Sequence, residues 1–231
     1  MLARSAHTPK DRSVSSDRDT IDPRNLIAHA ERLGIAVTPT AATEVLTFLD
    51  AMLVTNQHIN LTAVRDRGDA VVLHALDSLA FQLSELEPRH ALDLGTGNGF
   101  PGIGVAALFP HAKVTLMDKT GKKVRAIQGC LETARLERVA AIQMDAKQAP
   151  SLDRDLRGGF DVCTARAVAR PEVLAELAEP LVCAGGHLVA WLEEHATVTE
   201  RLRSFHLYHR VRYRLPAPAE RDRQLAVWEK R

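Results

Sequence analysis

The stretch from Asp93 to Gly102, DLGTGNGFPG, places four glycines beside one carboxylate. It follows the apolar run Ala91-Leu92 and precedes a second apolar run from Ile103 to Leu108, a pattern typical of a buried strand that turns into a helix. Glycine permits a positive φ and lets a ligand approach closer than any side chain would allow. The sequence therefore predicts a ligand-binding loop, in which the bare backbone is supplied by Gly95, Gly97, Gly99 and Gly102.

The charge of Asp93 indicates which ligand the loop binds. A nucleotide pyrophosphate would use the helix N-terminus, and a carboxylate two residues before Gly95 would repel it. An ammonium or sulfonium centre would be attracted, and S-adenosylmethionine carries both, while its carboxylate can still use the helix N-terminus. Two alternatives stay open: a glycine turn with a capping aspartate and no ligand, and an NAD site, because Gly97 to Gly102 also fits G-x-G-x-x-G.

Polar residues also follow the neighbouring strands that the sequence predicts. Asp118 ends the second strand about twenty residues after the glycine loop, where a carboxylate can accept from both ribose hydroxyls of either cofactor. The third strand ends at Met144-Asp145-Ala146-Lys147, where backbone groups and Asp145 could meet an adenine edge. The fourth ends in Arg166, which puts a guanidinium at the mouth of the cleft. Each residue alone is compatible with a solvated loop charge, but their shared position at strand ends favours a binding site.

The elements that position these residues alternate between strand and helix after Glu87-Pro88, which calls for a parallel sheet with right-handed crossovers. We predict an α/β fold with a doubly wound, seven-stranded, mostly parallel sheet that closes with a hairpin. The expected strands are Ala91 to Leu94, Lys113 to Met117, Ala140 to Met144, Asp161 to Ala165, His187 to Leu192, Leu207 to Arg214 and Gln224 to Trp228. The expected helices are Ile103 to Phe109, Lys122 to Ala134, Pro171 to Leu181 and Val198 to Phe205.

The chain before this sheet divides into two parts. Residues 1–21 are polar and predict a disordered tail. Residues 22–87 predict a small helical appendage with helices from Asp22 to Gly34, from 41 to 55 and from 69 to 83, and residues 88–231 form the Rossmann-like domain. His74, Asp77 and Ser78 share one side of the third helix. A His-Asp pair that fixes this helix to its neighbour is favoured over a metal site, because a third ligand is missing nearby.

The composition excludes several classes. With 30 Lys and Arg against 29 Asp and Glu, any contact with nucleic acid must come from local patches. The three cysteines, at 130, 163 and 183, make no C-x-x-C pair and predict buried thiols in a reducing compartment. No apolar stretch is long enough to span a membrane. We therefore expect a cytoplasmic monomer without a membrane or metal partner.

Five motifs in order give the chain a specific resemblance: NLTAVRD, HALDSL, DLGTGNGFPG, TLMDKTGKKVRAI and TARAVA. Over roughly Ala42 to the end, the sequence resembles the bacterial RsmG family, also called GidB. The resemblance implies a class I methyltransferase that uses S-adenosylmethionine to methylate N7 of a guanosine in the decoding-region loop of 16S rRNA. An NAD-dependent oxidoreductase is the least favoured alternative, because Asp93 would repel a pyrophosphate and the sequence shows no acid or base for hydride transfer.

The family's cofactor contacts correspond by position to Gly95, Phe100, Ala146, Lys147 and Arg166. Together with Asp93, Gly97 and Asp118 these are the expected cofactor-binding residues. Asp93 is expected to face the cationic methionine moiety, Gly95 and Gly97 to give it room, and Phe100 to pack along its aliphatic part.

Three departures from the family pattern concern contacts near the acceptor and the adenine. Lys147 stands where the family has a glutamate, Leu192-Glu193 replace a Lys-Gly pair, and Thr55 replaces an aromatic residue. They keep two alternatives open: a methyltransferase with another RNA or small-molecule acceptor, and a non-catalytic RNA-binding relative.

The implied reaction needs no catalytic acid or base, because guanine N7 carries a lone pair and no proton. The enzyme has to align nucleophile, methyl group and sulfur, with Arg166 orienting either the cofactor or the guanine. The target base is expected to be unpaired or out of its stack. We expect the partner to be 16S rRNA or a 30S assembly particle, bound by Lys123, Arg125, Arg166 and Arg170. The alternative is that these residues only form a solvated, charged surface.

Overall fold

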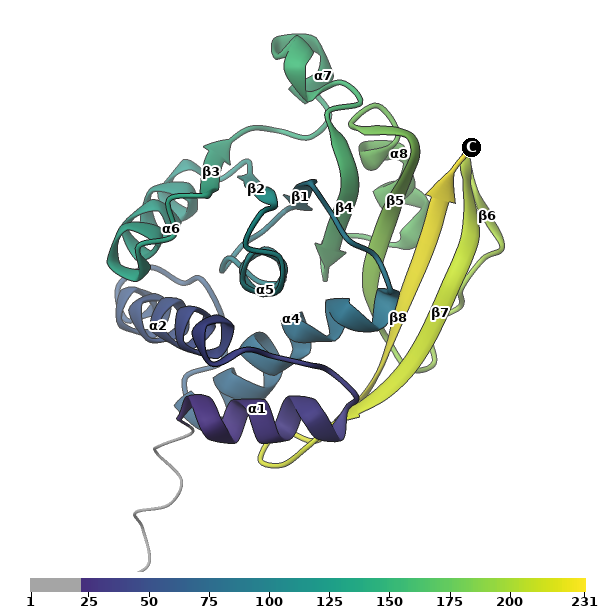
Figure 1. Ribbon diagram of the computed structural model, residues 1–231. Helices are drawn as coiled ribbons and strands as arrows, with labels where there is room; N and C mark the ends of the chain where they lie inside the picture. The colour runs from purple at the N-terminus through teal and green to yellow at the C-terminus, as the bar shows by residue number, and fades with distance from the viewer. Residues whose placement is uncertain (1–21) are drawn as a thin grey trace, which may run out of the picture.

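The computed structural model describes residues 22–231, and the tail expected over residues 1–21 lies outside them. A single sheet of eight strands runs through the described chain in the order β3-β2-β1-β4-β5-β8-β7-β6 (Figure 1). Its strands are β1 His90–Leu94, β2 Lys113–Asp118, β3 Val139–Gln143, β4 Phe160–Arg166, β5 Val182–Glu193, β6 Arg201–Leu202, β7 Phe205–Leu215 and β8 Arg221–Lys230.

The pairing of the strands confirms the doubly wound, mostly parallel sheet. Strands β1 to β5 pair in parallel, while β8 joins β5 in antiparallel register and β7 continues the hairpin. β1 pairs with β2 on one side and with β4 on the other, so the strand order reverses at β1. In such sheets the ligand lies outside the carboxyl ends of the strands at this reversal. The glycine loop leaves the sheet at that point.

The helices cover both faces of the sheet. α5 (Gly102–Leu108) and α6 (Gly121–Ala134) share one hydrophobic core with the N-terminal helices, and α8 (Pro171–Ala178) packs into a second core across the sheet. The expected helices at these three places are confirmed. A short helix α7 (Ala149–Leu152) and a 3-10 turn (Arg154–Leu156) connect β3 to β4.

The prediction of a helix from Val198 to Phe205 is wrong. This segment holds β6, a two-residue strand that pairs with the start of β7, and it is the additional strand of the eight-stranded sheet. The spacing of Val198, Leu202 and Phe205 fits one face of a helix, but Leu202 and Phe205 pair as strand partners and are buried in the hydrophobic core that also receives α8. Arg203 between them has φ 57°, a left-handed conformation that turns the chain back. Tertiary pairing has overridden the local periodicity.

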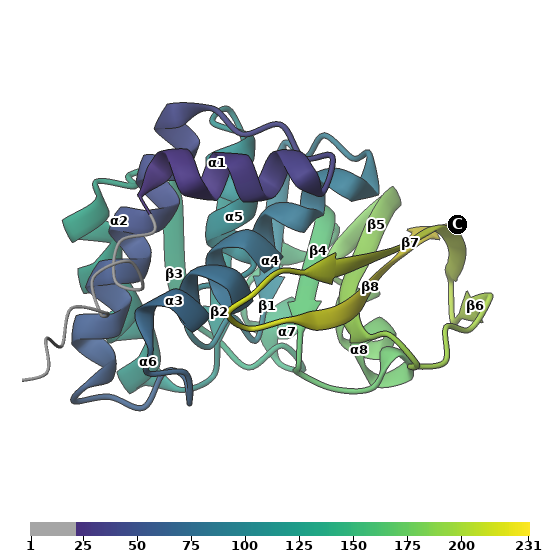
Figure 2. The same ribbon diagram turned by 90° about the horizontal axis from the view of Figure 1, so that it is seen from below.

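Three N-terminal helices are present, and they pack closely on the sheet domain (Figure 2). α1 (Pro23–Arg32) and α2 (Pro39–Asn56) each begin with a proline, and the side chains of Asp22 and Thr38 accept from backbone N–H groups of the first turn. These are ordinary N-terminal caps. Because their apolar residues join the core of α5 and α6, the helices form one wall of the molecule.

The third helical segment changes type along its length. It runs through α3 (Arg67–Ala70), a π-helix (Val71–Leu76), α4 (Asp77–Leu79) and a 3-10 helix (Ala80–Ser84). A π turn widens the helix, and such turns are frequent at functional sites. Here the π-helix carries His74 and ends immediately before Asp77. Within residues 22–231, no helix combines the length and apolar character needed to cross a bilayer.

Candidate cofactor and acceptor cleft

The glycine loop is held open by backbone conformations that favour glycine. Gly95, Gly97 and Gly99 have φ of 69°, 58° and 94°. The loop is tied to the neighbouring strand, because Gly97 N donates to Asp118 Oδ2 at 3.1 Å and Thr96 N donates to Met117 O at 3.0 Å. The loop therefore presents its backbone in a fixed shape beside the end of β2.

Asp93 lies beneath this loop and does not line the cleft above it. The residue is 1% exposed, and its carboxylate accepts from Thr96 Oγ1 at 2.6 Å and from Thr164 Oγ1 at 2.8 Å. This position departs from the expectation that Asp93 faces a ligand cation. Burial raises its pKa to about 6, while hydrogen bonds from Thr96, Thr164 and the Gly102 backbone act in the opposite direction. The carboxylate stabilises the loop from below.

A cleft of about 800 Å³ lies above the loop, at the carboxyl ends of β1, β4 and β5. It extends from the glycine loop to the start of β8, where Glu193, Arg221 and Arg223 form the far wall. Seven of the expected site residues line it: Gly95, Gly97, Phe100, Asp118, Lys123, Arg166 and Arg170. Asp93, Arg125, Ala146 and Lys147 are outside its lining.

Asp118 connects the loop to the next helix. The residue is 8% exposed, and while Oδ2 accepts from Gly97, Oδ1 accepts from Thr120 N at 2.8 Å. A carboxylate has about four acceptor positions, so these two bonds leave acceptor capacity for a ligand hydroxyl. The geometry suits a carboxylate that fixes the loop and also faces the cleft.

Arg166 is a fixed cation in the cleft wall. Its side chain is 11% exposed and pairs with Asp77 Oδ2 at 2.9 Å. Its nitrogens also donate to Leu73 O at 2.7 Å and to Phe100 O at 3.4 Å. Because four backbone and side-chain groups surround the guanidinium, including His74, its plane has one well-defined orientation.

His74 and Asp77 do not bond to each other; Arg166 lies between them. Arg166 Nη2 is 3.2 Å from His74 Nδ1, and His74 Nε2 is 3.0 Å from Thr62 Oγ1. Burial, with Arg166 next in importance, lowers the pKa of His74 to about 3. The ring is therefore neutral at physiological pH, its Nδ1 also lies 3.1 Å from Leu73 O, and it stacks on Phe100 with ring centres 5.9 Å apart.

Asp77 is the centre of a polar network that the sequence did not reveal. It is fully buried, and its second oxygen accepts from Tyr213 Oη at 2.6 Å. Its backbone carbonyl accepts from Trp191 Nε1 at 2.8 Å. Burial and the Asp77 charge raise the pKa of Tyr213 well above its ordinary value. The HALDSL spacing indicated His74 and Asp77, but nothing local indicates their partners on β5 and β7.

The remaining expected residues lie on elements next to the cleft. Ala146 and Lys147 follow β3, and Lys147 N donates to Asp145 Oδ1 at 3.0 Å in a tight turn. Arg125 belongs to α6, the helix that also carries the cleft residue Lys123. Val168 was not expected at the site; its side chain covers Gly95, where a Cβ would lie 2.8 Å from Val168 Cγ2.

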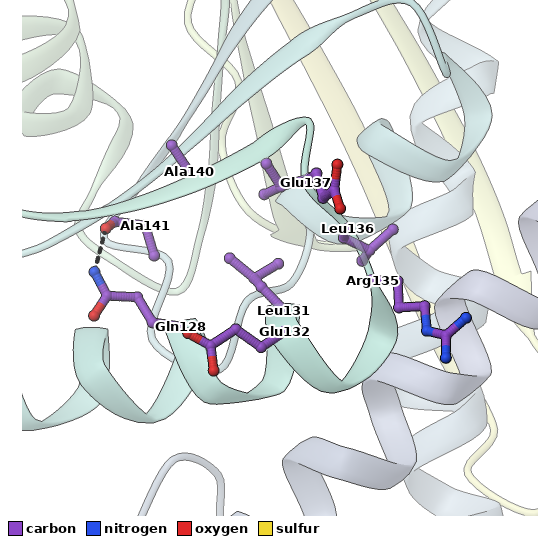
Figure 3. Close-up of a pocket in the computed structure, with 9 residues that line it drawn as sticks. Gln128, Leu131, Glu132, Arg135, Leu136, Glu137, Ala140 and Ala141 are labelled. Carbon is purple, nitrogen blue, oxygen red and sulfur yellow. Dashed lines mark hydrogen bonds between the residues drawn. The ribbon is translucent and has the colours of Figure 1, made fainter.

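A second hollow of about 600 Å³ lies between α6 and the edge strand β3 (Figure 3). Figure 3 shows the Gln128 side chain reaching the carbonyl of Ala141, a bond of 2.9 Å that occupies an acceptor of the strand edge. None of the glycine-loop residues lines this hollow. Within residues 22–231, no group of three or more His, Cys, Asp or Glu side chains could hold a metal ion.

Comparison with solved structures agrees with this fold. A mutant of MtNAS in complex with S-adenosylmethionine is 13% identical and aligns with a TM-score of 0.54 over 90% of this chain and 78% of that chain. Precorrin-6y C5,15-methyltransferase from Geobacter metallireducens is 12% identical, with a TM-score of 0.52 over 68% of this chain and 88% of that chain. These likenesses establish the class I methyltransferase fold.

Sequence relatives are more similar. Proteins named ribosomal RNA small subunit methyltransferase G from several bacteria match this chain. That of Parasynechococcus marenigrum is 34% identical over 70% of this chain and 66% of its own length. Those of Acinetobacter baumannii and Levilactobacillus brevis are 36% and 35% identical, over 65% and 74% of this chain and 70% and 72% of their own lengths. The family model for rRNA small subunit methyltransferase G, GidB, matches residues 42–225, and the chain belongs to this family.

Proposed function

We propose that the protein transfers a methyl group from S-adenosylmethionine to N7 of a guanosine in 16S rRNA. The observation that carries this proposal is the cleft itself. It joins a glycine loop and Asp118, suited to a nucleoside cofactor, to a wall of arginines suited to RNA. Family membership supports the same chemistry.

The cofactor side of the cleft is assigned to the loop and the strand ends around it. Gly95 and Gly97 offer bare backbone, Asp118 offers acceptor capacity for ribose hydroxyls, and Phe100 offers an apolar surface. Asp93 acts through the loop that it supports. The turn after β3, with Ala146 and Lys147, follows the strand beside Asp118, and we assign it to the adenine.

The acceptor side is assigned to the cations. Lys123 and Arg170 line the cleft, and Arg125 lies outside it on the same helix as Lys123, so these three suit RNA phosphates. Arg166 has little freedom to follow a mobile phosphate, because Asp77 and Leu73 O hold its guanidinium. A rigid guanidinium between loop and acceptor wall suits the orientation of reacting groups.

Methyl transfer to guanine N7 requires no proton transfer by this chain. S-adenosylmethionine supplies an electrophilic methyl group, and guanine N7 supplies a lone pair without a proton. The chain's residues therefore have to bind, orient and exclude water. His74 is neutral and fully engaged with Thr62 and Arg166, consistent with a supporting role and not with proton transfer.

We further propose that the protein is a cytoplasmic monomer that acts on 16S rRNA or on a 30S assembly particle. The test is transfer of labelled methyl groups to both substrates, each prepared from a strain that lacks the enzyme. Transfer to either one is expected, and no incorporation into either would contradict the proposal. Mass spectrometry of the labelled nucleotide distinguishes N7 of guanosine from another acceptor, and light scattering measures the oligomeric state.

A further inference from the structure

A pair of opposite charges forms the wall of the cleft that faces away from the glycine loop. Glu193 ends β5 and Arg223 lies near the start of β8, and the two residues are direct partners in the antiparallel register. Arg223 Nη1 donates to Glu193 Oε1 at 2.7 Å. Both residues line the cleft. The sheet therefore sets a donor and an acceptor side by side on one wall.

Both members of the pair retain capacity for a ligand. The Glu193 side chain is 68% exposed, and within the described residues its Oε2 accepts no hydrogen bond. The Arg223 side chain is 11% exposed; its Nε is buried and faces Asp77 Oδ1 at 4.0 Å, whereas its Nη2 is not buried and donates no hydrogen bond within the described part of the chain. The backbone is fixed as well, since Gln224 Nε2 donates to Glu193 O at 2.9 Å.

The Arg-Glu pair matches one purine better than the other. The Watson–Crick edge of guanine presents an acceptor at O6 beside two donors, N1–H and the N2 amino group. An arginine donates only and an ionised glutamate accepts only, so the pair presents the complementary pattern. Adenine presents the reverse, a donor at N6 and an acceptor at N1, and would set donor against donor and acceptor against acceptor. Flipped bases are commonly read through this edge.

Recognition of the Watson–Crick edge would let the enzyme distinguish guanine from adenine, which the proposed reaction requires. Guanine and adenine both carry N7 on the Hoogsteen edge, outside the Watson–Crick edge, so N7 alone cannot distinguish them. Asp118 is the other carboxylate that lines the cleft among the described residues, and it lies beside the glycine loop, where we assign its remaining acceptor capacity to the ribose of the cofactor. Glu193 is therefore the carboxylate that is available for base recognition.

We propose that Glu193 and Arg223 select the target guanine, with Glu193 accepting from N1–H and the N2 amino group while Arg223 donates to O6. The proposal rests on the proposed function and names how its acceptor is chosen. With the base held by its Watson–Crick edge, N7 takes part in no contact with this wall and stays free to receive the methyl group.

The test compares binding of GMP, IMP and AMP to protein saturated with S-adenosylhomocysteine, measured by calorimetry. IMP lacks the N2 amino group, and AMP reverses the donor and acceptor pattern. The wild-type protein is expected to bind GMP about 10-fold more tightly than IMP and about 100-fold more tightly than AMP. In Glu193→Gln the GMP-to-IMP ratio should fall to within about 3-fold and the GMP-to-AMP ratio should fall about 10-fold, because a neutral amide can also donate to adenine N1 while Arg223 still opposes the adenine N6 amino group.

Glu194→Gln is the matched control, since it removes the same charge one residue away and outside the cleft lining. It should keep the wild-type ratios. Equal or undetectable binding of the three nucleotides to the wild-type protein, or unchanged ratios in Glu193→Gln, would overturn the inference. Failure of the wild-type protein to methylate rRNA would instead overturn the proposed function, because nucleotide ranking does not depend on methyl transfer.

Discussion

Replacing Asp77 with asparagine tests the central claim about the cleft wall, that one buried carboxylate holds Arg166 in place. Asp77 is fully buried and accepts from Arg166 at 2.9 Å and from Tyr213 at 2.6 Å. Asparagine has the same shape but only one acceptor oxygen, and its amide nitrogen would face a donor. The substitution removes at least one charge-assisted bond and leaves a guanidinium that is only 11% exposed without a counter-charge.

The expected cost is about 3 kcal/mol of unfolding free energy, the lower end of the range for breaking one partner of a buried ion pair. Leu73 O and Phe100 O still accept from Arg166, which is why the lower end applies. Urea unfolding with linear extrapolation measures the difference. Asp50→Asn is the control, because Asp50 pairs with Arg67 on the surface at 2.7 Å, and its loss should cost less than about 1 kcal/mol.

The double variant Asp77→Asn, Arg166→Met separates loss of the pair from loss of one residue. Removing both charges should recover at least about 1 kcal/mol relative to the sum of the single substitutions. An Asp77→Asn protein within about 1 kcal/mol of wild type would refute the view that Arg166 depends on this carboxylate. Additive single substitutions would refute the direct coupling of the two residues.

Three further predictions concern the glycine loop. Because burial raises the pKa of Asp93 from 3.8 to about 6, the folded state binds its proton more tightly than the unfolded chain does. The stabilising contribution is complete below pH 4 and disappears as the pH rises through 6. Relative to Asp93→Asn, wild type should lose up to about 3 kcal/mol of unfolding free energy between pH 4 and pH 8, and a flat difference in urea unfolding would contradict the assignment. Asp93→Ala should weaken binding of S-adenosylmethionine markedly while the fold persists, because Thr96 loses its acceptor; calorimetry showing unchanged affinity would mean that the loop serves another ligand. Gly102→Ala should cost about 1–3 kcal/mol, since its Cβ would lie 2.3 Å from Leu116 Cδ2 and 2.8 Å from Asp93 Cβ. Its control, Gly129→Ala in α6, has no atom within 4 Å and should gain up to about 1 kcal/mol in thermal unfolding.

The parts of the fold that local pattern encodes were predictable. The apolar run before Asp93 and the glycines after it are adjacent in the chain, and the loop forms where they indicate. Asp118 could be placed beside the loop because strand ends meet at one edge of a parallel sheet. The sequence could not show that the Asp93 side chain is buried beneath the glycine loop, because the donors that hold it there include Thr164 on another strand.

What escaped prediction depends on contacts between distant segments. β6 forms because two residues pair with β7, although their spacing suits a helix. Tyr213 and Trp191 reach Asp77 only after the sheet is complete. The sequence around neither residue predicts a hydrogen bond to a buried carboxylate. The Arg223–Glu193 pair likewise needs the register between β5 and β8.

The position of β8 between β5 and β7 orders the assembly of the two halves of the cleft. The bond from Gly97 to Asp118 closes over 21 positions of the sequence and the bond from Arg223 to Glu193 over 30, so their loops are of similar length. They differ in their place along the chain, because Arg223 is synthesised more than a hundred residues after Asp118. During synthesis, the cofactor loop can thus form before the wall that would choose the base. The proposed selection of guanine therefore requires a chain in which β8 has already joined the sheet.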